Sequence, residues 1–215
     1  LDASTFKEMS EQKDILVIDT RSKESYTQEG TVPGSWYIGI DGNFAPWVGA
    51  IVLDINQKII FITDDELRVN EIVTRFSRVG YDHTLGYLNG GIDGWKTQDF
   101  DVDYIGSVSA AQFTDMLAKG SMEKPIDVRR ESEYLSEHVL GVESFPLDFI
   151  HANFAEIDPD KEYFLHCKTG YRSLIATSIL KANGVKKVTD VRGGYEAIKV
   201  CKAPLSEFVC PTTIL

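Results

Sequence analysis

The sequence is poor in cysteine. Only Cys167, Cys201 and Cys210 occur among its 215 residues. An odd number of cysteines at these spacings fits neither a disulfide framework nor a zinc site built from cysteine pairs. We therefore expect a reducing, cytoplasmic setting and no bound metal. In that setting each of the three thiols is either reactive or part of the packing.

Long apolar runs and an excess of positive charge are also missing. No stretch approaches the roughly 20 apolar residues of a membrane span, and no basic segment followed by an apolar one indicates a signal peptide. The chain has 22 Lys and Arg against 33 Asp and Glu, a formal net charge of -11. Such a chain repels phosphate backbones, so we expect neither a membrane nor nucleic acid as a partner.

The chain does contain an internal repeat, which is the first evidence on its organisation. A segment near residue 15 and a segment near residue 125 share the pattern Asp-x-Arg followed by Tyr. Three residues recur 108 positions later: Asp19, Arg21 and Tyr26 as Asp127, Arg129 and Tyr134. A Gly-Gly pair at 90–91 recurs at 193–194. We therefore predict two similar domains, residues 1–103 and 104–215.

Within each predicted domain, β-branched runs alternate with amphipathic segments. Residues 15–18 and 58–63 are typical of buried strands, and 67–79 predicts a helix that ends at Gly80. A strand over 162–166 and a helix over 172–182 repeat this order. The alternation predicts an α/β fold in which each domain has a mainly parallel sheet with helices on both faces. Ligands of such sheets bind at the carboxyl ends of the strands.

The loop after the predicted strand 162–166 carries the candidate chemistry. It reads Cys167, Lys168, Thr169, Gly170, Tyr171 and Arg172, and then turns into an apolar helix. Backbone N–H groups converge at such a helix start and favour the thiolate of a cysteine there. Lys168 and Arg172 add positive charge, and Arg172 offers two donors to an oxyanion. We predict that Cys167 is a nucleophile open to solvent and donor.

The spacing from cysteine to arginine separates two kinds of chemistry. Protein tyrosine phosphatases and their relatives use Cys-x5-Arg, a loop wide enough to encircle a phosphate. Here four residues separate Cys167 from Arg172, and Ser173 stands at the position that arginine takes in phosphatases. The smaller ring favours a sulfur atom carried on the cysteine over phosphate or arsenate chemistry.

These motifs resemble the rhodanese (sulfurtransferase) family over nearly the whole chain. The resemblance rests on the loop from Cys167 to Arg172, the Asp-x-Arg after the first strand of each domain, and the Gly-Gly pair before the last helix. It implies that Cys167 takes a sulfane sulfur from thiosulfate or a persulfide and passes it to a thiol or cyanide, without a cofactor. Small sulfur donors and thiol acceptors are then the partners. By the same resemblance the loop that binds the substrate consists of Lys168, Thr169, Gly170, Tyr171 and Arg172.

The first domain departs from this pattern. Asp64 stands where Cys167 stands in the second domain, and Asp65 and Glu66 follow it. Neighbouring carboxylates can bind a metal or act as acid and base, but a solvated acidic loop at a helix N-terminus is favoured. We interpret residues 1–103 as a non-catalytic rhodanese-like domain. The alternative for the protein is a docking or regulatory module of a larger hydrolase or persulfide-oxidising protein.

Residues 32–35 and 44–49 resemble the rhodanese repeats appended to metallo-β-lactamase-fold hydrolases of the persulfide dioxygenase type. The His-x-His-x-Asp-His motif of those hydrolases does not occur here. The resemblance implies a fused or associated domain of that fold, and a chain that begins at Leu1 suits the carboxyl part of such a fusion.

Residues near the loop have less specific expectations. Asp127 and Arg129 are expected to make contacts at the strand end. Strand alternation should turn the side chain of His166 away from Cys167. Cys201 and Cys210 lack cationic or glycine-rich surroundings, which favours structural roles.

Overall fold

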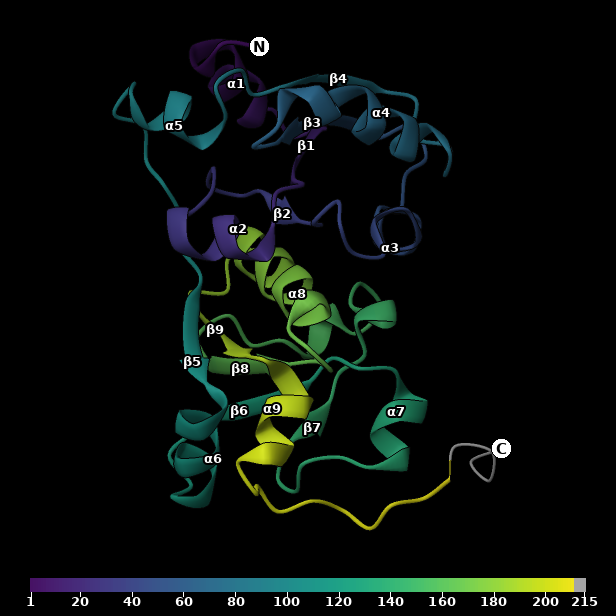
Figure 1. The fold of residues 1–215 in the computed structure, drawn as a ribbon, viewed down its shortest axis with the longest axis vertical. Coiled ribbons are helices and arrows are strands. Elements are labelled where there is room, and N and C mark those ends of the chain that lie inside the picture. Colours follow the sequence, from purple (N-terminus) through teal and green to yellow (C-terminus); the bar gives the residue numbers. More distant parts are fainter. Residues whose placement is uncertain (211–215) are drawn as a thin grey trace. The chain divides into compact units, whose positions relative to one another are not determined.

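In the computed structural model, which describes residues 1–210, the chain forms two compact units (Figure 1). Unit 1 covers Leu1–Tyr104 and unit 2 covers Ile105–Leu215. Both are built on parallel β-sheets, as the alternation of strands and helices predicts. None of the helices found in residues 1–210 is both long and apolar enough to cross a membrane.

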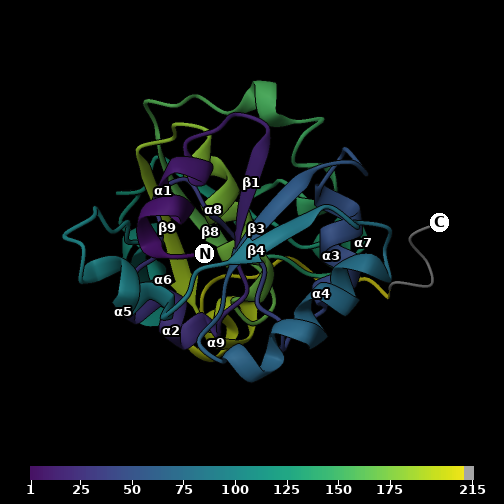
Figure 2. The ribbon, with the colours of Figure 1, turned by 90° about the horizontal axis from the view of Figure 1, so that it is seen from above.

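Unit 1 has a four-stranded sheet in the order β2-β1-β3-β4, and every pair of neighbours is parallel. Its strands are β1 (Ile15–Asp19), β2 (Trp36–Tyr37), β3 (Lys58–Ile62) and β4 (Thr84–Tyr87). Its helices are α1 (Ala3–Ser10), α2 (Lys23–Glu29), α3 (Phe44–Ile51), the 3₁₀ turn η1 (Glu66–Arg68), α4 (Val69–Ser77) and α5 (Gly91–Lys96). Figure 2 shows helices on both sides of the strands.

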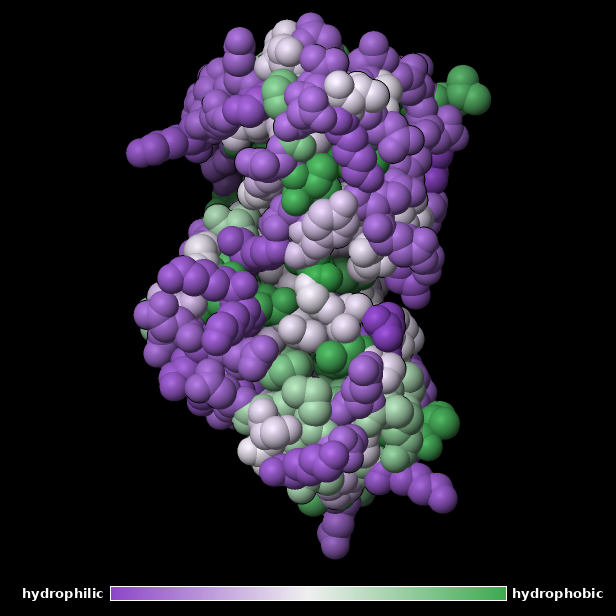
Figure 3. Space-filling model, turned by 90° about the vertical axis from the view of Figure 1, so that its left-hand side faces the viewer, coloured by the Kyte–Doolittle hydropathy of each residue, from purple (hydrophilic) through white to green (hydrophobic). Residues whose placement is uncertain are grey.

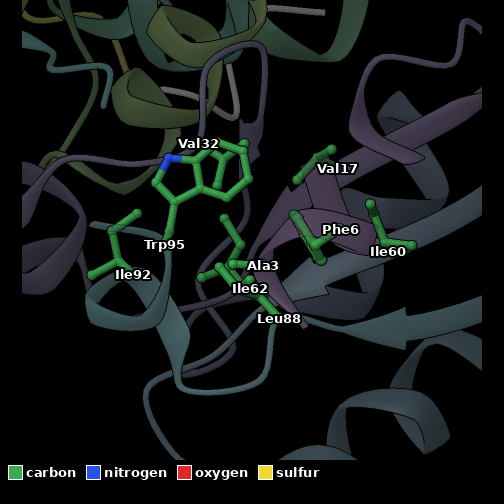
Figure 4. Close-up of a cluster of buried hydrophobic side chains, with 9 residues drawn as sticks. All are labelled: Ala3, Phe6, Val17, Val32, Ile60, Ile62, Leu88, Ile92 and Trp95. Carbon is green, nitrogen blue, oxygen red and sulfur yellow. The ribbon is translucent and has the colours of Figure 1, made fainter. Parts of the chain in front are cut away.

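Alternating side chains of β1 and β3 supply both faces of this sheet. On one face Ile60 and Ile62 join Phe6 of α1 and Trp95 of α5 in an apolar cluster (Figure 4). On the other face Phe61 lies against Phe76 of α4, with ring centroids 6.2 Å apart. Because successive strand residues point to opposite faces, a strand apolar at every position must be covered on both sides.

Unit 2 has a five-stranded parallel sheet in the order β5-β9-β8-β6-β7. Its strands are β5 (Gly106–Ser109), β6 (Lys124–Asp127), β7 (Glu143–Ser144), β8 (Glu162–His166) and β9 (Lys187–Arg192). Its helices are α6 (Ala110–Ala118), α7 (Glu131–Ser136), α8 (Tyr171–Ala182) and α9 (Gly194–Val200), with 3₁₀ turns η2 (Leu147–Phe149) and η3 (Phe154–Glu156). The carboxyl ends of β6, β8 and β9 are adjacent, which brings the loops that follow them together.

The packing of unit 2 holds the candidate loop from two sides. Phe113 of α6 and Ile198 of α9 pack with Phe164 and Val191 of the sheet. Helix α8 is buried at every position from Ser173 to Leu180. The start of α8, where the loop with Cys167 ends, is therefore fixed by core packing.

One sequence prediction for unit 1 is wrong in detail. The pattern over 67–79 predicts a single helix with Leu67 on its apolar face, but η1 occupies 66–68 and α4 begins at Val69. Leu67 is 92% exposed. The Asp65 carboxylate accepts the N–H of Leu67 and starts the 3₁₀ turn instead.

Hydrophilic residues cover most of the visible face of unit 1, the upper part of the space-filling view in Figure 3. This agrees with a chain in which 26% of the residues are charged. The apolar side chains of the strands lie inside instead, where Ile59, Ile60 and Ile62 are fully buried.

Candidate active site

Cys167 lies directly after β8, and Gly170 precedes the first residue of α8. The N–H of Gly170 donates to the Cys167 sulfur at 3.2 Å, and the Ser173 hydroxyl donates to it at 3.6 Å. Gly170 has φ +103°, a conformation that glycine adopts without strain. Two donors therefore converge on the thiol at the N-terminus of a 12-residue helix, where negative charge is favoured.

The Gly-Gly pair at 193–194 allows the start of α9 to lie against the backbone of this loop. The N–H groups of Tyr195 and Glu196, in the first turn of α9, donate to the carbonyl oxygens of Cys167 and Lys168 at 2.7 and 3.1 Å. A Cβ on Gly194 would lie 2.4 Å from the Cys167 carbonyl oxygen. The repeated Gly-Gly is thus explained by close backbone approach.

The expectation that Cys167 is open to solvent is wrong. The residue is only 1% exposed, because β8 ends among core side chains and the loop folds over the thiol. Within the loop, Lys168 and Thr169 are exposed, whereas Gly170 is buried and Tyr171 is half-buried. The exposed part of the loop therefore consists of Lys168 and Thr169, and the thiol lies beneath the surface.

Nη1 and Nη2 of Arg172 both bind a protein carboxylate. Its Nη1 and Nη2 donate to the two carboxylate oxygens of Glu133 at 2.5 and 3.0 Å. Burial raises the pKa of the Glu133 carboxyl, but the Arg172 hydrogen bond and charge outweigh it and leave the pKa below its usual value. Lys168 likewise lies 3.8 Å from the Glu196 carboxylate. Both cations of the loop thus have a protein anion beside them.

Asp127 and Arg129 form the predicted contact at the end of β6. Arg129 Nε donates to both carboxylate oxygens of Asp127, at 3.0 and 2.8 Å. His166 Nδ1 lies 3.8 Å from Asp127 Oδ1, with the ring fully buried. Burial lowers the pKa of His166, and the Asp127 charge opposes this only in part. His166 is therefore a neutral, structural ring beside the nucleophile's backbone.

A cleft of about 300 Å³ opens beside the Cys167 loop. The residues lining it come from α7, from the loops after β6 and β8, from α9 and from the carboxyl-terminal segment: Arg129, Ser132, Glu133, Ser136, Glu137, Lys168, Tyr195, Glu196 and Phe208. Arg192 is not among them and donates to Ser107 instead. Most of these residues lie outside every motif in the sequence. Glu137 follows Glu29 by the 108 residues of the repeat, a signal that could have identified it.

The family profile described as "Rhodanese-like domain" matches residues 2–98 and 109–201. The chain belongs to the rhodanese-like family. Both units contain a match, and the structure gives both a parallel sheet covered by helices, so the prediction of a tandem α/β protein is confirmed. Sulfurtransferase is the activity class at the level of the family, as the names of the relatives show.

Three relatives illustrate the similarity. The uncharacterized protein YqhL of Bacillus subtilis is 34% identical over 71 residues, 33% of this chain and 56% of that protein. The putative sulfur carrier protein YrkF of the same organism is 30% identical over 90 residues, 42% of this chain and 49% of that protein. A sulfurtransferase of Allochromatium vinosum is 24% identical over 93 residues, 43% of this chain and 87% of that protein. The chain thus spans about half the length of the first two relatives.

The first rhodanese-like domain has a carboxylate where the second has its thiol. Asp64 Oδ1 lies 3.8 Å from Nη1 of the fully buried Arg21 side chain. Asp65 is occupied in starting η1, and Glu66 Oε1 accepts the N–H of Gly90. Within residues 1–210, no group of three or more His, Cys, Asp or Glu side chains is arranged to hold a metal ion.

Proposed function

We propose that the second rhodanese-like domain is a sulfurtransferase that carries a sulfane sulfur on Cys167. The observation that supports this best is the pair of donors from Gly170 and Ser173 that converge on its sulfur. Hydrogen bonds to a charged sulfur stabilise both the attacking thiolate and the persulfide anion that follows. The relatives named as sulfur carrier and sulfurtransferase support the same class.

The transfer has two balanced steps. The Cys167 thiolate attacks the outer sulfur of thiosulfate or of a low-molecular-weight persulfide. A new sulfur–sulfur bond forms on Cys167, the donor's sulfur–sulfur bond breaks, and sulfite or a thiolate leaves with the electron pair. A thiolate or cyanide then attacks the outer sulfur of the Cys167 persulfide, and Cys167 leaves as thiolate. No proton has to move and no cofactor is needed.

Lys168, Thr169, Gly170, Tyr171 and Arg172 are proposed as the loop that binds the donor. The backbone of the loop stabilises charge on the transferred sulfur, as the Gly170 N–H does for Cys167. The positive charges of Lys168 and Arg172 are partly neutralised, because the carboxylates of Glu196 and Glu133 lie beside them. Other groups of the cleft must therefore balance the rest of the donor's negative charge.

Mass spectrometry of the protein after incubation with thiosulfate or glutathione persulfide tests the proposal. The expected result is a mass gain of one sulfur atom, located on the peptide with Cys167 and reversed by a thiol or cyanide. Cys167→Ser should abolish loading and turnover, whereas Cys201→Ser, a second thiol of the same unit, is the matched control and should keep both. Loading on Cys201 or Cys210, or full activity of Cys167→Ser, would contradict the proposal.

For the first domain we propose a non-catalytic docking or regulatory role. Its support is Asp64, because a carboxylate cannot form a persulfide and repels anionic donors. The resemblance of residues 32–35 and 44–49 supports a partner with a metallo-β-lactamase fold, fused or associated, in a cytoplasmic setting. Loss of binding to such a hydrolase on deletion of residues 1–103 would support this role, and unchanged binding would exclude it.

A further inference from the structure

Arg129 is the buried cation of the cleft, and its Nη1 has no hydrogen-bond acceptor in residues 1–210. The residue is 4% exposed and lines the cleft. Its Nε binds Asp127, and its Nη2 binds Asp127 and the carbonyl oxygen of Glu137, at 2.7 and 2.8 Å. In that part of the chain no acceptor is bonded to Nη1. Three N–H donors on Nε and Nη2 thus hold the guanidinium in place, and the N–H groups of Nη1 remain available to a ligand.

The first domain shows what this nitrogen binds. Arg21 corresponds to Arg129 in the repeat, and its Nε and Nη2 bind Asp19 as those of Arg129 bind Asp127. Arg21 Nη1 donates to the Glu29 carboxylate at 2.9 Å and lies 3.8 Å from the Asp64 carboxylate. In the copy without a thiol, carboxylate oxygens therefore fill the position that is open in the second copy.

Neither carboxylate reaches Arg129. Glu137 corresponds to Glu29 in the repeat, but it accepts hydrogen bonds from the Tyr195 hydroxyl and from Lys199. Cys167 replaces Asp64. The Tyr195 ring that holds Glu137 away also lies against the guanidinium, 4.0 Å from its central carbon, so the arginine cannot turn from the cleft.

We infer that Arg129 Nη1 binds the carboxylate of the sulfur donor, and that the donor is a low-molecular-weight persulfide bearing that group. This rests on the proposed sulfur transfer at Cys167. Guanidinium groups favour planar carboxylates, and about 300 Å³ suits a small molecule. Three carboxylates, Glu133, Glu137 and Glu196, also line the cleft, so Arg129 is the buried cation there that a donor's carboxylate can meet.

Two donors that differ only in the carboxylate test this on the unaltered full chain: the persulfides of N-acetylcysteine and of N-acetylcysteine amide. The acid should show a KM about tenfold lower than the amide, which corresponds to ~1.4 kcal/mol, with little change in kcat. Equal KM values would overturn the inference. Because the wild-type protein is used, this comparison does not depend on any variant folding.

Arg129→Lys keeps a positive charge toward Asp127 but lacks Nη1. It should remove the tenfold advantage of the acid and leave the KM of the amide unchanged. Arg130→Lys, at the exposed neighbour that lies 3.4 Å from Asp148, is the control and should keep the advantage. A thiosulfate KM that depends on Arg129 while acid and amide remain equal would assign Nη1 to a sulfonate and overturn the carboxylate assignment.

The test separates this inference from the function on which it rests. If both persulfides load Cys167 equally well, sulfur transfer stands and the role of Arg129 fails. If neither persulfide loads Cys167 and thiosulfate does not load it either, both fail together.

Discussion

Glu133 and Arg172 form a two-pronged ion pair beside the Cys167 loop, although they lie 39 residues apart in the sequence. The guanidinium that could neutralise an incoming anion is thus already neutralised by the protein. The Arg172 side chain is 15% exposed and the Glu133 side chain is 31% exposed, so the ion pair is only partly shielded from solvent. The Glu133–Arg172 ion pair therefore determines how much positive charge the loop presents to a substrate.

We predict that Glu133→Gln lowers the KM for thiosulfate by about fivefold, with a smaller effect on kcat. The substitution removes one negative charge beside the loop and leaves the charge of Arg172 without a counter-charge on Glu133, which is worth ~1 kcal/mol at a partly exposed position. Steady-state kinetics with thiosulfate and cyanide measure the change. Glu131→Gln, an exposed position on the same helix α7, is the control. An unchanged or higher KM would show that Arg172 does not meet the donor.

Gly194→Ala should abolish sulfur transfer and destabilise unit 2. The added Cβ would lie 2.4 Å from the Cys167 carbonyl oxygen and 2.8 Å from backbone atoms of Lys168. Gly120→Ala is a matched control, because Gly120 has φ +61° against +57° for Gly194 and nothing lies within 4 Å of its Cβ position. The control should cost ~1 kcal/mol from backbone strain, and Gly194→Ala about 2 kcal/mol more.

Urea denaturation, followed by alkylation of Cys167 and mass spectrometry of its peptide, measures the stability of unit 2 in this comparison. Tryptophan fluorescence would not, because all three tryptophans, Trp36, Trp47 and Trp95, lie in unit 1. Equal losses of stability in the two variants would contradict the close approach of α9 to the loop.

The parts of the site predicted from sequence are those that local chain geometry dictates. The Gly-Gly pair and the order strand, Cys167, Gly170, helix follow from backbone requirements that any copy of the fold shares. The Glu133–Arg172 pair could not be predicted, because its members lie on α7 and α8, 39 residues apart, and meet only in the folded chain. The burial of Cys167 was missed for the same reason, since nothing in the loop itself shows how closely it packs.

Leu67 illustrates the opposite error, in which an apolar residue was assigned to a helix face that its spacing does not fit. It precedes Ile72 by five and Phe76 by nine residues, about 1.4 and 2.5 helical turns, so it would not share the face on which those two residues are buried in α4. The Asp65 side chain competes with the helix for the N–H of Leu67 and holds it in a 3₁₀ turn. Periodicity therefore gave the helix and its buried face, and a local hydrogen bond decided where it begins.

We predict that Asp64→Cys does not give the first domain sulfur transfer. A thiol there would lack the Gly170 equivalent, because Asp65 and Glu66 follow it, and Glu29 would still occupy Arg21 Nη1. The double variant Cys167→Ser, Asp64→Cys removes the background of the second domain. Its turnover of thiosulfate should equal that of Cys167→Ser alone. Turnover above that of Cys167→Ser would show that the acidic loop does not prevent sulfur transfer in the first domain.

The last prediction concerns His166, whose ring is fully buried beside Cys167. Burial lowers its pKa in the folded protein, Asp127 opposes this shift and Arg129 adds to it. Its Nδ1 lies 3.4 Å from the Cys167 carbonyl oxygen, whereas in residues 1–210 its Nε2 has no hydrogen-bond partner, so no acceptor stabilises a proton on Nε2. The unfolded chain binds a proton near pH 6.5 and the folded chain only at lower pH. Stability from the neutral ring is therefore complete above pH 6.5 and declines as the pH falls from 6.5 toward the folded pKa.

The slope in that window should approach, and not exceed, ~1.4 kcal/mol per pH unit for this group. His166→Asn should be less stable at pH 8 but should lose less stability between pH 6.5 and 5 than the wild type, since asparagine does not titrate. The measurement is urea denaturation at several pH values, read by alkylation of Cys167. His151→Asn, at a half-buried position outside the sheet, is the control. Parallel pH profiles for wild type and His166→Asn would show that the folded and unfolded chains bind this proton equally. Burial between the edge-on Phe113 ring and the stacked Tyr195 ring would then not disfavour the charged form.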